Sequence, residues 1–127
     1  WTLKGHAAQR AVGAWHMGWD VAQKTSGGDW LSPYLAILLN DPYPVVRYIA
    51  KRSLESVMGE KVPDYDFMGD SSDRQRIYQE IMAHYASNVS QRGGDGKLLL
   101  NDAGQIDQRT YRRLLQQRDD RPITIKE

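Results

Sequence analysis

Cysteine is absent from the 127 residues, phenylalanine occurs once, and neither sign of charge is in clear excess. Without cysteine the chain can form no disulfide, no thiolate metal site and no covalent c-type haem attachment. The 17 basic and 16 acidic residues leave a formal net charge of +1, which argues against nucleic acid as an electrostatic partner. No apolar run approaches the roughly 20 residues that a membrane span requires, and no signal peptide is visible.

The apolar content is sufficient for a folded domain. Hydrophobic residues make up 40% of the chain, so we expect one core of ordinary size rather than global disorder. The chain begins at Trp1 rather than at methionine. We therefore expect a processed chain or a fragment of something longer.

The most informative stretch covers residues 35–54. Apolar residues recur at helical spacing both before and after the turn at residues 41–44. Pro42 disfavours helical geometry at Asp41 and so ends the first helix. Pro44 suits the first turn of the next helix, where its missing N–H is not needed, and Gly59 is a natural stop. The pattern predicts two short helices joined by a tight turn, that is, a helical hairpin.

This hairpin resembles a HEAT-like helical repeat. The residues that match the family pattern, in order, are Leu35, Leu38, Leu39, Asp41, Pro42, Val46, Arg47, Ala50 and Leu54. In that family the turn aspartate and the helix arginine are structural and are often linked in a ladder between neighbouring repeats. The resemblance therefore implies structural roles for Asp41, Pro42 and Arg47.

An internal comparison extends the resemblance to residues 5–59. The segment 6–17 can be laid on the segment 43–54, so that Arg10 falls on Arg47. The offset is about 37 residues, close to the roughly 40–47 of such repeats. The earlier segment would then be the second helix of a preceding repeat, whose first helix the chain lacks.

The expected N-terminal helix has two apolar stripes. Ala7, Ala11, Ala14 and Gly18 form one, while Ala8, Val12, Trp15 and Trp19 form the other. Small residues on the first stripe allow the hairpin to approach closely, and tryptophan is a frequent interface anchor. We therefore predict that the second stripe is an interface, covered by a protein partner or by an upstream segment of the same protein. The alternative is that the C-terminal part of the chain folds back over it.

The rest of the chain is expected to cap the repeats. The predicted helices cover residues 6–23, 30–40, 44–58, 73–89 and 107–118. The long connection 59–72 breaks the repeat rhythm, and its apolar residues Val62, Tyr65, Phe67 and Met68 should anchor it across the hairpin. The expected fold is all-α: a short HEAT-like, solenoid-type array over residues 1–59, then capping helices and an extended tail over residues 60–127, in one compact domain.

Residues that could carry chemistry are few and scattered. His6 and His16 lie ten apart, so one helix does not bring them together, and His84 is distant in sequence. The acidic residues near position 66 lack a clearly placed distal glutamate for calcium. The arginines between positions 109 and 121 are expected to form a solvated face with internal ion pairs. The alternative is that they bind an acidic partner or a nucleic-acid backbone. We assign no catalytic residue and no metal site.

The leading hypothesis is a non-catalytic protein-interaction or scaffold module, as a fragment or subunit of a larger assembly. The segment 114–122 also resembles the C-terminal repeat region of bacterial secreted multihaem cytochrome-like proteins. That resemblance implies an accessory role in electron transfer, with haem in an upstream segment or a partner and a periplasmic or extracellular location. A third hypothesis is enzymatic, because some HEAT-like proteins act on bilin chromophores or damaged DNA, but no acid or base placement supports it.

Overall fold

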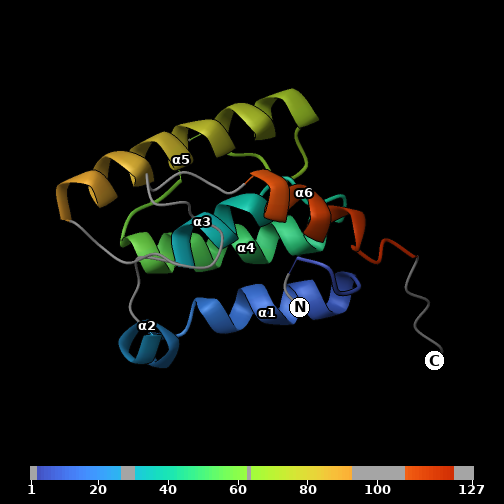
Figure 1. The fold of residues 1–127 in the computed structure, drawn as a ribbon, viewed down its shortest axis with the longest axis horizontal. Helices are drawn as coiled ribbons and strands as arrows, with labels where there is room; N and C mark the ends of the chain where they lie inside the picture. Colours follow the sequence, from blue (N-terminus) through green and yellow to red (C-terminus); the bar gives the residue numbers. More distant parts are fainter. Residues whose placement is uncertain (1–2, 27–30, 63, 93–107, 122–127) are drawn as a thin grey trace.

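The computed structural model describes residues 3–26, 31–62, 64–92 and 108–121 (Figure 1). Within these ranges the fold is all-helical and contains no strand, as predicted. The helices are α1 (Ala7–Met17), α2 (Asp20–Ser26), α3 (Leu31–Leu38), α4 (Pro44–Met58), α5 (Ser71–Arg92) and α6 (Gln108–Gln116). The described helices include none that is both long and apolar enough to cross a bilayer.

The helices pack side by side in an order that places α1 at one edge. Helix α1 packs on α4, α4 packs on α3, and α3 packs on α5. Figure 1 shows α1 and α5 at opposite edges, with α3 and α4 between them and α6 beside α3. Buried residues from both sides of the expected boundary at residue 59, among them Leu35, Leu54, Val62 and Ile77, belong to one core cluster.

The central hairpin has the expected ends. Helix α3 finishes in a tighter turn, in which the N–H groups of residues 39–41 donate to carbonyls three residues earlier. It is therefore slightly shorter than the predicted 30–40. Helix α4 matches the prediction of 44–58, with Pro44 in its first turn and Gly59 in the left-handed conformation at φ 73° just after its end.

The predicted helix 6–23 is wrong as a single helix, because the chain turns between α1 and α2 at Gly18. The Gly18 and Trp19 N–H groups donate to the Trp15 and His16 carbonyls, which closes α1 with a three-residue spacing. Gly18 lies against α4, where an added Cβ would come within 2.6 Å of the Ser53 Oγ. The Gly18 carbonyl accepts a hydrogen bond of 3.0 Å from the Ser56 hydroxyl. Contacts with α4 therefore fix the break.

The connection after α4 packs back on the hairpin through most of its apolar residues. Val62 and Tyr65 are buried, and the Tyr65 hydroxyl donates to the Leu39 carbonyl at 2.5 Å. The expectation fails for Met68, which is 64% exposed. Helix α5 begins two residues before the predicted 73 and ends beyond 89, and Asp70 caps it by accepting from the Asp73 N–H at 3.0 Å.

Candidate interaction surface

The outward face of α1 and α2 carries the largest exposed side chains of the N-terminal part of the described chain. Val12 is 43% exposed, Trp15 54%, Trp19 44% and Val21 69%, and Ala8 is exposed beside them. We call Ala8, Val12, Trp15, Trp19 and Val21 the α1 patch. Helix α1 lies at the edge of the molecule in Figure 1, with α4 on its other side. The four residues of the predicted interface stripe therefore all face solvent.

The aromatic rings of the patch are arranged by contacts with one another. The Trp15 and Trp19 ring centroids are 4.9 Å apart, with the rings edge to face. The His16 ring stacks on Trp15 at 5.5 Å and meets Trp19 at 4.6 Å. Offset and edge contacts of this kind are favourable for aromatic pairs. The two indoles thus form one ordered, solvent-facing cluster.

The opposite stripe of α1 is buried, as its small side chains suggested. Ala7, Ala11 and Ala14 belong to the core cluster, and α1 packs chiefly on α4. Because these side chains are short, the two helix backbones can approach closely. Within the part of the chain that the structure describes, one face of α1 is therefore used in packing and the other is not.

The C-terminal part of the chain does fold back onto α1, but at the end away from the tryptophans. The Asp119 N–H donates to the Lys4 carbonyl at 3.0 Å. The Tyr43 hydroxyl lies within hydrogen-bonding distance of the Asp120 carbonyl, at 2.9 Å. The alternative left open by the sequence is thus realised for the N-terminal end of α1 only, and the α1 patch stays uncovered by the described residues.

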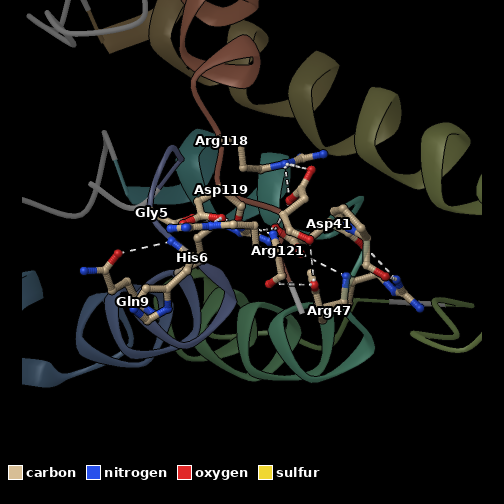
Figure 2. A network of polar contacts seen from close by, with 12 residues as sticks. Gly5, His6, Gln9, Asp41, Arg47, Arg118, Asp119 and Arg121 are labelled. Atoms are coloured by element: carbon tan, nitrogen blue, oxygen red, sulfur yellow. Dashed lines mark hydrogen bonds and ion pairs between the residues drawn. The ribbon is translucent and has the colours of Figure 1, made fainter. Parts of the chain in front are cut away.

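A buried ion pair holds this end of the molecule together. The Arg10 side chain is fully buried, and its Nε and Nη2 atoms donate to the two carboxylate oxygens of Asp41 at 2.7 and 3.1 Å. Its Nη1 atom donates to the carbonyls of Gly5 and Asp119. Figure 2 shows Gly5, Asp41 and Asp119 gathered there from three separate segments. Such a two-pronged pair suits the fixed geometry of the guanidinium group.

Arg10 was not among the residues to which the sequence assigned a role, although a signal for it existed. The internal comparison places Arg10 on Arg47, the arginine expected to serve a structural function. In the structure both arginines reach the turn that contains Asp41. Arg10 lies between Ala7 and Ala14 on the buried side of α1. A charged side chain at such a position indicates a buried partner of opposite charge.

Arg47 binds main-chain oxygens rather than a carboxylate. Its Nη1 atom donates to the carbonyls of Asp41 at 2.6 Å and Pro42 at 2.9 Å, and its Nε atom donates to the Phe67 carbonyl at 2.7 Å. The Asp41 carboxylate is instead bound by Arg10 and by the Tyr43 N–H. Arg47 therefore fixes the turn and the connection after α4, and Pro42 contributes its carbonyl to that contact.

The three histidines lie on different parts of the fold. His6 caps α1, accepting from the Gln9 N–H and donating its own N–H to the Gln9 side chain. His16 belongs to the aromatic cluster, and His84 is on α5. Among the residues that the structure describes, no three potential metal ligands from His, Cys, Asp and Glu come together.

The buried Tyr65 and the partly buried Tyr78 give the fold a response to alkaline pH. Burial raises the pKa of Tyr65 and of Tyr78 from 10.0 to about 12. A raised folded-state pKa means that the unfolded chain loses these protons more readily. The contribution of these tyrosines to the free energy of unfolding should therefore be fully present below about pH 10. It should be lost as the pH rises towards 12.

We expect Tyr65→Phe to reduce the alkaline loss of stability, because one of the phenols whose pKa is raised by burial is then absent. At neutral pH the variant should lose about 1 kcal/mol of unfolding free energy, since the Leu39 carbonyl loses its donor. Urea unfolding between pH 7 and 12 measures both effects. Tyr48→Phe, which removes the hydroxyl of the exposed Tyr48, is the control at neutral pH. An unchanged alkaline slope in Tyr65→Phe would contradict the assignment.

Comparisons with protein-family models, with curated proteins and with solved structures find no match to this chain. The α1 patch and the contacts that fix its surroundings are therefore the features of the molecule that bear on its function.

Proposed function

We propose that this chain is a non-catalytic helical-repeat module that binds another protein surface through the α1 patch. The observation that carries the proposal is the pair of tryptophans, 54% and 44% exposed, whose rings pack edge to face at the edge of the fold. Tryptophan is enriched among residues that dominate binding energy at interfaces. Contiguous exposed apolar patches on soluble proteins are often functional.

Three features support the repeat character. Helices α1 and α4 pack against each other, and the segments that contain them are those that the internal comparison aligns. Arg10 and Arg47, which occupy equivalent positions in that comparison, both bind the turn at Asp41. The link between Arg10 on one unit and Asp41 on the next is the kind of ladder that the HEAT-like resemblance implies.

The first test measures whether the two indoles are free in the isolated chain. A variant with Trp1→Phe and Trp30→Phe retains only Trp15 and Trp19 as fluorophores. We expect acrylamide to quench both strongly in the monomer. Shielded indoles in a folded monomer would contradict the proposal, because the patch would then be covered by the chain itself.

The second test separates binding from folding. Replacing Trp15 or Trp19 singly by alanine should cost well below the roughly 3–5 kcal/mol of a buried tryptophan, because each ring is about half exposed. Urea unfolding gives this value. A loss in that larger range would show that the tryptophans serve the core rather than an interface.

A further inference from the structure

The α1 patch has small side chains at one end and large ones at the other. Ala8 and Val12 lie towards the N-terminus of α1, and Trp15 and Trp19 lie towards its C-terminus. Residues three or four apart share one face of a helix, and the contact between the two indoles extends this line past the end of α1. The face is thus graded in size along its length.

Two copies of such a face are complementary in shape when the second copy runs antiparallel to the first. A two-fold axis between Val12 and Trp15 brings Ala8 opposite Trp19 of a second copy, and Val12 opposite Trp15. Each large ring then meets a small side chain, and the same contacts occur twice, as two-fold symmetry requires. A parallel pairing would instead place ring against ring and alanine against alanine.

The charges at the two ends favour the same arrangement. Lys4 precedes α1 and Asp20 follows it; both are exposed, and neither forms an ion pair among the described residues. In the antiparallel arrangement Asp20 of each copy approaches the N-terminal end of α1 in the other, near Lys4. A carboxylate is also stabilised there by the helix dipole. A parallel arrangement would place like charges together.

We propose that the partner of the α1 patch is a second copy of this chain, bound antiparallel through α1. This inference rests on the proposed function and names its partner. The exposed parts of the two tryptophans together amount to the surface of about one whole tryptophan, roughly 150–250 Å². The exposed parts of Val12 and Val21 add to the area that each copy could bury. That area is below the roughly 800 Å² per partner of a standard interface. The dimer is therefore weak, with a dissociation constant in the roughly micromolar range or above.

Sedimentation equilibrium of the full 127-residue chain across the micromolar range tests the proposal. Wild type should show a reversible monomer–dimer equilibrium. Trp19→Ala removes the large ring, and Ala8→Trp places a ring opposite a ring, so each should weaken association about tenfold or more. The double variant Ala8→Trp/Trp19→Ala exchanges large and small positions and should restore association. Met68→Ala, at an exposed residue of the connection after α4, should have no effect.

The outcomes separate this inference from the proposed function. A monomer at every concentration with quenchable indoles would overturn self-association and leave the proposed function standing. A monomer with shielded indoles would overturn both. A wild-type dimer that Ala8→Trp leaves unchanged, or a double variant as weak as the two single changes combined, would overturn the antiparallel pairing. Circular dichroism of each variant shows that the fold is retained.

Discussion

Replacing Arg10 with methionine should lower the free energy of unfolding by roughly 3–5 kcal/mol. Methionine keeps much of the aliphatic volume but removes the guanidinium group, which binds both carboxylate oxygens of Asp41. Asp41 would then be a buried carboxylate without its ion-pair partner, which is more costly than the loss of the attraction alone. Urea unfolding at neutral pH, followed by circular dichroism, measures the change.

Two further variants test the cause of this loss. Arg76 pairs with Glu80 at 2.9 Å on the exposed side of α5, so Arg76→Met should cost only about 0.3–0.5 kcal/mol. Adding Asp41→Asn to Arg10→Met removes the stranded charge and keeps an acceptor for the Tyr43 N–H. The double variant should therefore lose less than the sum of the two single changes. Equal losses for Arg10→Met and Arg76→Met would refute the role given to the buried pair.

The second large effect is expected for Arg47→Ala, which should cost about 2–4 kcal/mol of unfolding free energy. The change removes the donor of three main-chain carbonyls, those of Asp41, Pro42 and Phe67. These carbonyls hold the turn of the hairpin and the connection after α4 in place, and the Asp41 carbonyl contact is buried. Chemical unfolding compared with Arg52→Ala, an exposed arginine on the same helix, isolates the effect.

Arg47→Ala should leave the α1 patch unaffected, because Arg47 contacts the turn and the connection rather than the tryptophans. In the Trp1→Phe/Trp30→Phe background, acrylamide quenching of Trp15 and Trp19 should be the same with and without Arg47→Ala, at temperatures where both proteins are folded. If the variant instead keeps its stability and loses association, Arg47 is a binding residue and its structural assignment is wrong.

The HEAT-like resemblance and the weaker resemblance to multihaem cytochrome-like proteins both stay predictions. The ion pair that joins α1 to the hairpin turn at Asp41 is the contact from which we propose the first. The second depends on the segment 114–122, of which the structure describes residues up to 121. In those residues the structure shows ion pairs between Arg118 and Asp120, between Asp119 and Arg121, and between Asp120 and the buried Arg10.

The sequence alone determined the features that depend on neighbouring residues along the chain. Pro44 and Gly59 set the bounds of α4, because proline fits a first helical turn and glycine adopts positive φ without strain. The two stripes of α1 follow from helical spacing, so the exposed face with Trp15 and Trp19 could be predicted before the fold was known. Because side-chain directions repeat about every 3.6 residues along a helix, the face on which a residue lies can be predicted from its spacing in the sequence.

Only the tertiary structure decided the features that depend on distant segments. The break at Gly18 is fixed by Ser53 and Ser56 of α4, and the α1 pattern alone gives no sign of it. The pairing of Arg10 with Asp41 joins residues from separate helices, and the segment after α6 covers one end of α1 but not the tryptophans. Which end was covered depended on where the last helix packed, and a buried charge selects its partner only when the fold brings the two together.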